Sequence, residues 1–166
     1  GDVFVSLTNN KAAGDYHGTI FKIVEDEKDK SGDTFTAEDY LIVGPEEGFS
    51  SPDNLVFDKH GNLWFATDVS GSSLGKDEYA KFTSNGVFLV PRSGERQGEV
   101  IQVASAPVAA EMTGLCFHPD GKTLFVSVQH PGETSKDLDN LTSHWPLGRN
   151  AIPKSSVIAI TGDFLV

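Results

Sequence analysis

A repeated strand-turn-strand unit constrains the fold more than any other feature of this chain. Residues 51–68, SPDNLVFDKHGNLWFATD, form an apolar strand, a polar turn containing glycine and a second apolar strand. Residues 111–130, EMTGLCFHPDGKTLFVSVQH, repeat the pattern, and Leu115 follows its counterpart Leu55 by 60 residues. A third, partial copy at residues 1–10, GDVFVSLTNN, matches only the second half of the unit. We therefore expect the chain to begin inside a repeat.

Short strands and glycine-bearing turns at this spacing are typical of β-propeller blades. Apolar and polar residues alternate with period two in most segments, whereas no window of helical length shows a capped 3.6-residue period. The sequence predicts an all-β fold, a partial β-propeller of about two to three blades of antiparallel strands. A single domain is expected, with blades at residues 1–43, 51–103 and 111–166.

Strands and loops can be placed within these segments. Outside the two repeated hairpins, we expect strands at residues 3–7, 19–24, 34–43, 87–91, 100–103 and 156–160. Polar loops are expected at residues 25–33 and 69–83. A long excursion from 130 to 153 carries two histidines and a tryptophan, and such loops are often functional.

The length of the chain limits what it can close. Its 166 residues suffice for one core, but a closed propeller of at least four such blades needs about 240 residues or more. We interpret the chain as a fragment of a six-bladed propeller. Open sheet edges would favour association with the missing remainder of the propeller.

Composition excludes several classes of protein. The chain has 24 acidic and 13 basic residues, a net charge of -11 without a clustered basic face, so nucleic acid is not expected as a partner. No stretch approaches the ~20 apolar residues of a transmembrane segment. The single cysteine, Cys116, excludes an internal disulfide. Its place between Leu115 and Phe117 predicts a buried, inert thiol.

The candidate chemistry lies where the repeated units begin. Asp53 and Glu111 each precede an apolar strand, and the innermost strands of propeller blades begin at one mouth of the central channel. Converging carboxylates repel one another unless a cation holds them, and hard oxygen ligands suit Ca²⁺, Mn²⁺ or Fe³⁺. An Asx turn after Pro52 is the alternative for Asp53.

Other polar residues stand near the ends of the inner hairpins. These candidates are Asn9, Asn10, Asp68, His130 and Glu133. The alternative for His130 and His144 is a structural hydrogen bond within a loop, and Trp145 is expected to anchor its loop. The sequence contains no phosphate-binding Gly-Lys-Ser/Thr loop, HExxH motif or GxSxG motif.

The ordered motifs resemble the C-terminal half of the PhoX-type bacterial alkaline phosphatases over nearly the whole chain. The motifs are VFVSLTNN, HGTIFKI, TFTAEDYLIVG, SPDNLVFDKHGNLWFATDVSGS, EMTGLCFHPDGKTLFVSVQHPGE, SHWP and SSVIAI. The resemblance implies a propeller enzyme, periplasmic or extracellular, that hydrolyses small phosphomonoesters with a cluster of Fe³⁺ and Ca²⁺ on the channel axis. SPD with GNLW alone also occurs in gluconolactonase-like propellers.

The resemblance also assigns roles to residues. Glu111, in its E-x-T-G motif, matches a catalytic and metal-binding glutamate of the family. Asp53, Asn10 and Glu133 fall in other family motifs, and we interpret them as further metal ligands. His130 is interpreted as a substrate-binding residue.

The chain also departs from the family pattern. The family's earlier cluster glutamate and cysteine ligand belong upstream of residue 1, and Cys116 does not take the cysteine's place. Residues 107–110, PVAA, stand where the family often has an arginine. The segment alone is expected to be inactive. A calcium-dependent lactonase or esterase propeller and a non-enzymatic scaffold are the alternative functions.

Overall fold

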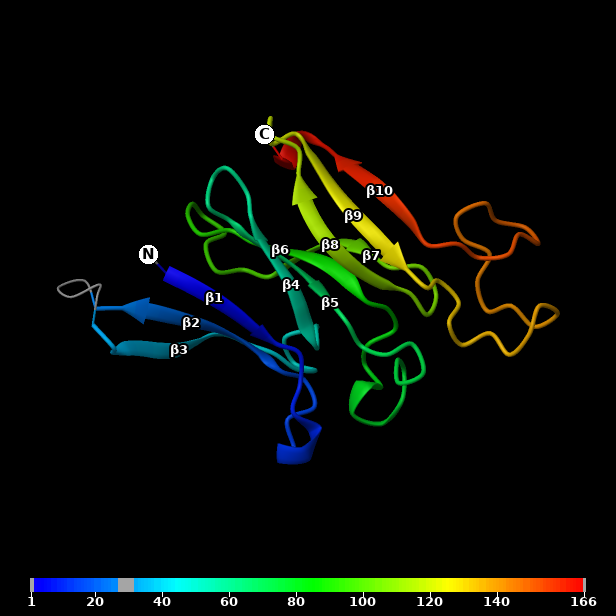
Figure 1. Cartoon of the computed structure of the whole chain (residues 1–166), viewed down its shortest axis with the longest axis horizontal. Coiled ribbons are helices and arrows are strands. Elements are labelled where there is room, and N and C mark those ends of the chain that lie inside the picture. The colour runs from blue at the N-terminus through cyan, green and yellow to red at the C-terminus, as the bar shows by residue number, and fades with distance from the viewer. Residues whose placement is uncertain (1, 27–31, 166) are drawn as a thin grey trace.

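The computed structural model describes residues 2–26 and 32–165, and its strands form three antiparallel sheets (Figure 1). The first sheet has the order β1-β2-β3, and the second has the order β4-β5-β6-β7. The third has the order β10-β9-β8. The strands are β1 (Asp2–Leu7), β2 (Thr19–Glu25), β3 (Phe35–Ile42), β4 (Pro52–Phe57), β5 (Leu63–Thr67), β6 (Gly86–Val90), β7 (Ile101–Ser105), β8 (Glu111–Phe117), β9 (Thr123–Gln129) and β10 (Ser156–Thr161).

Only short helices accompany the strands in the described part of the chain. They are the 3-10 helices η1 (Lys11–Ala13), η2 (Asp77–Tyr79) and η3 (Asp163–Leu165). None of the helices described is long and apolar enough to cross a membrane. The all-β prediction is confirmed, and the expected strands lie within about two residues of the observed bounds.

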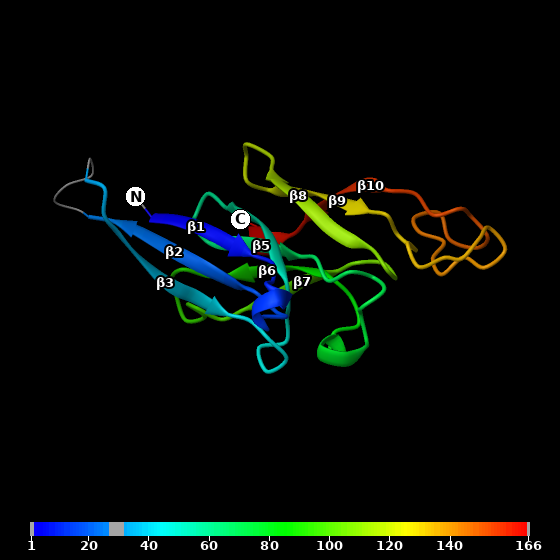
Figure 2. The same cartoon turned by 60° about the horizontal axis from the view of Figure 1, so that its bottom comes forward.

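The three sheets meet along their first strands. Each of β1, β4 and β8 forms one edge of its sheet. Strand β1 contacts β4, and β4 contacts β8, so the three sheets follow one another side by side (Figures 1 and 2). This arrangement is compatible with a partial propeller, in which the first strand of each blade is innermost.

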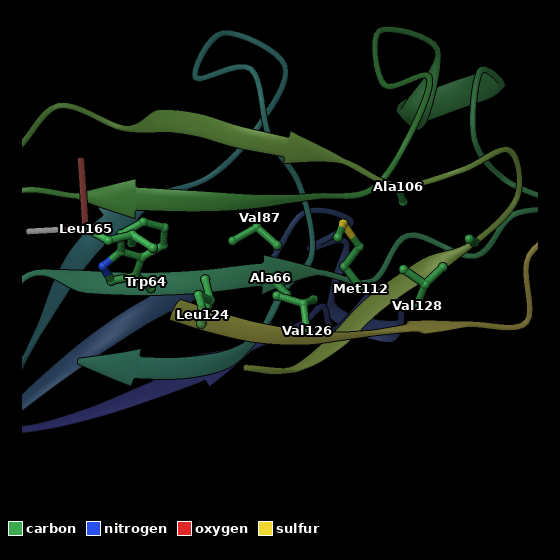
Figure 3. Packing of buried hydrophobic residues seen from close by; sticks show 10 residues of the cluster. Trp64, Ala66, Val87, Ala106, Met112, Leu124, Val126, Val128 and Leu165 are labelled. Carbon is green, nitrogen blue, oxygen red and sulfur yellow. The ribbon is translucent and has the colours of Figure 1, made fainter. Parts of the chain in front are cut away.

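Strand β5 is buried on both faces because it lies between two hydrophobic clusters. Trp64 and Ala66 point into a cluster shared with the third sheet (Figure 3). Leu63 and Phe65 point into a cluster shared with the first sheet, where the Phe65 ring stacks on Phe88 with their planes 12° apart. Successive side chains of β5 point to opposite faces. The packing of both faces therefore holds all three sheets together.

The interpretation of Cys116 as a buried thiol is wrong, because its side chain is exposed. A register shift between Thr113 and Cys116 marks a bulge in β8. Leu115, within the bulge, and Phe117, after it, pack against the cluster around Trp64. Alternation then places Cys116 on the opposite, outward face.

The segment 69–83 is less polar than expected. Val69, Tyr79 and Phe82 are buried together in a third hydrophobic cluster. Residues 27–31 of the other expected polar loop, 25–33, lie outside the described residues. The excursion from 130 to 153 contains no strand or helix and extends away from the sheets beyond β9 (Figures 1 and 2). Trp145 anchors it by packing against the cluster around Trp64, as expected.

Asp58 holds the turn between β4 and β5. Its Oδ1 accepts the backbone N–H groups of His60 and Asn62, each at 2.9 Å. Its Oδ2 accepts the Asn62 amide at 2.9 Å and the Trp64 indole N–H at 3.0 Å. Burial raises the pKa of Asp58, but these hydrogen bonds outweigh burial and hold the pKa below its ordinary value.

Replacing Asp58 tests this turn. Asp58→Ala should lower the free energy of unfolding by about 1–3 kcal/mol at pH 7, because the donors lose a charged acceptor. Since the pKa is lowered in the folded chain, the stabilisation is complete above the unfolded value of about 3.9 and is lost as the pH falls through the folded value. Urea unfolding at pH 7 and pH 3 should show the difference shrinking at pH 3.

Asp120→Ala, in the corresponding turn of the other repeat, is the control, because the Asp120 side chain is half exposed. It should change stability much less. A loss for Asp58→Ala that is undiminished at pH 3 would contradict the electrostatic account of the turn.

Candidate metal centre

Three carboxylates converge where the inner hairpins of the second and third sheets meet. Asp53 is the second residue of β4, Asp68 directly follows β5, and Glu111 is the first residue of β8. One carboxylate oxygen from each lies within 4.8 Å of the others. The backbone N–H of Asp68 donates to the carbonyl of Ser51 at 2.9 Å, which fixes the end of β5 beside the start of β4. The expected convergence of Asp53 and Glu111 is therefore observed.

Bulges shape both inner strands next to these acids. The pairing of β4 with β5 shifts between Pro52 and Leu55, and the pairing of β8 with β9 shifts between Thr113 and Cys116. A bulge leaves residues unpaired in the ladder and turns their side chains. In β4 the unpaired residues are Asp53 and Asn54, so both are available to neighbouring sheets.

Asn54 connects Asp53 to the third sheet. Its Nδ2 donates to Asp53 Oδ2 at 2.8 Å. Its Oδ1 accepts the Gly114 N–H at 2.6 Å and the hydroxyl of Thr113. On the other side, the Ser6 hydroxyl of β1 donates to the Asp53 carbonyl. The position of Asp53 is thus set by all three sheets.

Asn54 and Ser6 are not among the residues predicted from the sequence. Asparagine is uncommon inside strands, and Asn54 occupies the position that Gly114 occupies in the other repeat. The difference between Asn54 and Gly114 at matching positions of the two repeats is the feature of the sequence that could have pointed to Asn54. For Ser6, nothing in the sequence distinguishes it from other small strand residues.

The carboxylates perturb one another's titration. Burial raises the pKa of Glu111, which is only 9% exposed, and the neighbouring Asp68 charge raises it further. Burial also raises the pKa of Asp68, with a further contribution from Asp53. His130 opposes both shifts. Negative charge is therefore concentrated at a partly buried point, which a cation would relieve.

His130 and Glu133 lie beside the three acids. The His130 ring places Nε2 at 3.2 Å from Glu111 Oε2 and Nδ1 at 3.0 Å from Glu133 Oε2. Glu133 Oε1 accepts the Gly71 N–H at 2.6 Å. The structure thus brings both predicted residues to the site, with His130 in contact with Glu111.

The other predicted polar residues have local roles. Asn9 and Asn10 are exposed, and Asn10 pairs with Asp15 through its backbone at the start of η1. His144 Nδ1 lies 3.0 Å from the carbonyl of Ala151. This contact is the structural hydrogen bond within a loop that was the alternative to a functional role for His144. The described contacts of Asn10 and His144 do not include the three acids.

Comparison with known proteins identifies relatives. The family model for alkaline phosphatase PhoX matches residues 1–132. Among solved structures, Pseudomonas fluorescens PhoX in complex with vanadate, a transition state analogue, is similar at 30% sequence identity with a TM-score of 0.82. The similarity covers 97% of this chain and 31% of that one, so this chain spans about a third of the relative's length. A search of the curated proteins finds no match.

Neutralising one acid should stabilise the metal-free chain. Because the pKa of Asp68 is raised in the folded chain, stability falls as the pH rises from the unfolded value, about 3.9, through the folded value. Asp68→Asn removes this loss. It should therefore raise the free energy of unfolding at pH 7 by about 0.2–1 kcal/mol, the range for partly exposed charge pairs.

The measurement is urea unfolding with a chelator present at pH 7 and pH 4, where the gain should be smaller. Asp39→Asn on exposed β3 is the matched control and should change stability at pH 7 much less. A variant less stable than the parent chain at pH 7 would contradict the repulsion.

Proposed function

Because the chain belongs to the PhoX alkaline phosphatase family, we propose that it forms part of a metal-dependent phosphatase that hydrolyses phosphate monoesters. The observation that carries the proposal is the convergence of Asp53, Asp68 and Glu111 within 4.8 Å. The activity belongs to the whole protein, because this chain corresponds to 31% of the similar PhoX chain.

The residues present fit hard cations. Three carboxylates offer only oxygen atoms, which Ca²⁺ and Fe³⁺ prefer. Partial burial and, to a lesser extent, mutual repulsion raise the pKa values of Glu111 and Asp68, as expected for a site that is completed by positive charge. Asp53, Asp68 and Glu111 would hold the cations, and the ligand roles of Asn10 and Glu133 stay predictions.

The chain's own residues would position the cations and the substrate. Asn54 and Ser6 hold Asp53 in place, so that the three carboxylates keep their spacing. His130 lies beside Glu111 with its side chain 41% exposed, and both of its ring nitrogens contact carboxylates, so its role as a substrate-binding residue stays a prediction. Hard cations bound here would supply Lewis-acid catalysis by offsetting the negative charge of the phosphate.

The charge of the chain is consistent with this proposal. A net charge of -11 would repel an anionic phosphate, and cations at the three acids would reverse the local field. The similar PhoX structure holds vanadate, a transition state analogue, which supports phosphoryl chemistry in that relative. We further expect the whole protein to act in the periplasm or outside the cell.

Elemental analysis tests the proposal directly. The longest natural polypeptide that carries this segment should be purified without chelator and assayed with a phosphate monoester. Iron and calcium together with activity would support the proposal. Calcium without phosphatase activity would favour a lactonase or esterase, and the absence of both metals would leave a scaffold.

Glu111→Gln in the same polypeptide should remove a ligand without changing the size of the side chain. Loss of an outer partner of a metal ligand costs roughly 10–100-fold in activity or metal affinity. Because Glu111 would itself be a ligand, we expect kcat/KM to fall by more than this and bound metal to be lost. Glu99→Gln is the control, because Glu99 pairs with Arg96 on an exposed turn. Unchanged metal content and rate in Glu111→Gln would contradict the assigned role.

A further inference from the structure

We propose that Glu133 acts as a positioning residue, which links the loop after Asp68 to the His130 ring and so orients Glu111 for cation binding. This inference rests on the proposed metal site and assigns Glu133 a different role from the ligand role in the sequence prediction. The contacts of Glu133 with Gly71 on one side and with His130 on the other form the Glu133 bridge.

The first half of the bridge requires a glycine. Glu133 Oε1 accepts the Gly71 N–H at 2.6 Å. A Cβ atom added to Gly71 would lie 2.5 Å from that same oxygen, 3.1 Å from Glu133 Cγ and 3.0 Å from Ala109 Cβ. Any side chain at position 71 would therefore push Glu133 away. Gly71 stands three residues after Asp68, so this contact fixes the segment that leaves the site.

The second half of the bridge orients a ring against Glu111. Glu133 Oε2 lies 3.0 Å from His130 Nδ1, and His130 Nε2 lies 3.2 Å from Glu111 Oε2. Both oxygens of Glu133 are thus engaged by groups of the chain. Carboxylates that bind metals are commonly held in place by hydrogen bonds from outer partners, and His130 is such a partner for Glu111.

The backbone holds the same loop against the segment before Glu111. The Gly132 N–H donates to the Val108 carbonyl at 2.9 Å, and the Glu133 N–H donates to the His130 carbonyl at 3.1 Å. His130 itself has φ of 35°, an uncommon conformation for a residue other than glycine. The surrounding contacts therefore impose this turn, which aims the ring at Glu111.

The bridge consequently joins the segment that follows Asp68, the segment that precedes Glu111 and the loop that follows β9. A site whose ligands come from separate strands binds best when their spacing is fixed beforehand. Loss of the bridge should leave the ligands in place but less well oriented. We expect cation affinity to fall by about 10–100-fold, as for other outer partners of metal ligands.

Terbium binding to the purified chain tests the inference, with Tb³⁺ as a luminescent substitute for calcium. Glu133→Ala and Gly71→Ala should each weaken Tb³⁺ binding by about 10–100-fold, and the double variant should be little worse than either. Glu133→Gln retains an acceptor for Gly71 and should keep most of the affinity. Gly44→Ala is the control, because its Cβ would lie 3.2 Å from the end of the flexible Glu47 side chain and at an ordinary 3.8 Å from His17 Cδ2.

The luminescence lifetime in H₂O and D₂O distinguishes the two roles of Glu133, because it reports the number of coordinated waters. A positioning residue can be removed without adding water to the bound ion. Additional coordinated water in Glu133→Ala, with affinity lost equally in Glu133→Gln, would show a ligand and overturn the inference. Unchanged affinity in both Glu133→Ala and Gly71→Ala would also overturn it.

Hydrogen exchange on the metal-free chain separates this inference from the proposed function. The Gly71 amide should be protected in the parent chain and exchange faster in Glu133→Ala. Equal exchange in the two chains would overturn the bridge even if Tb³⁺ binds. If the parent chain does not bind Tb³⁺, the metal site and the orienting role of Glu133 are both overturned. The exchange rate of the Gly71 amide would then still show whether Glu133 accepts its hydrogen bond.

Discussion

The hydrogen bonds of Asn54 are the interaction on which the geometry of the site depends. Asn54 lies in the bulge of β4, where its side chain can reach Asp53 on its own strand and Gly114 on β8. The apolar clusters on the two faces of β5 hold the sheets together, but apolar packing is not directional. The amide of Asn54 supplies the direction that packing lacks, and it sets where Asp53 stands relative to Glu111.

The same geometry brings like charges together. Asp53, Asp68 and Glu111 approach within 4.8 Å although burial and mutual repulsion raise the pKa values of two of them. A fold gains nothing in stability from such an arrangement in the absence of a cation. At functional sites, a local loss of stability is typically offset by favourable packing elsewhere. Here the large buried side chains around Trp64 and Phe65 provide that packing.

The sequence could predict the hairpins and the convergence of Asp53 and Glu111, because both follow from a repeat whose turns carry glycine and aspartate. It could not predict the contacts of Asn54 between sheets, since these depend on bulges that periodicity does not reveal. The contact of Glu133 with Gly71 joins two loops outside the strands, where periodicity gives no signal. Cys116 illustrates the limit. Its neighbours Leu115 and Phe117 face the core, so alternation turns the cysteine outward, although the three together read as one apolar run.

If the three carboxylates bind a cation, X-ray diffraction should locate it between them. Crystals of this chain, or of a longer natural polypeptide that carries it, would be grown with calcium and compared with crystals grown with a chelator. We expect calcium-dependent density about 2.3–2.6 Å from oxygens of Asp53, Asp68 and Glu111. Ordered carboxylates with no density between them at saturating calcium and iron would contradict it.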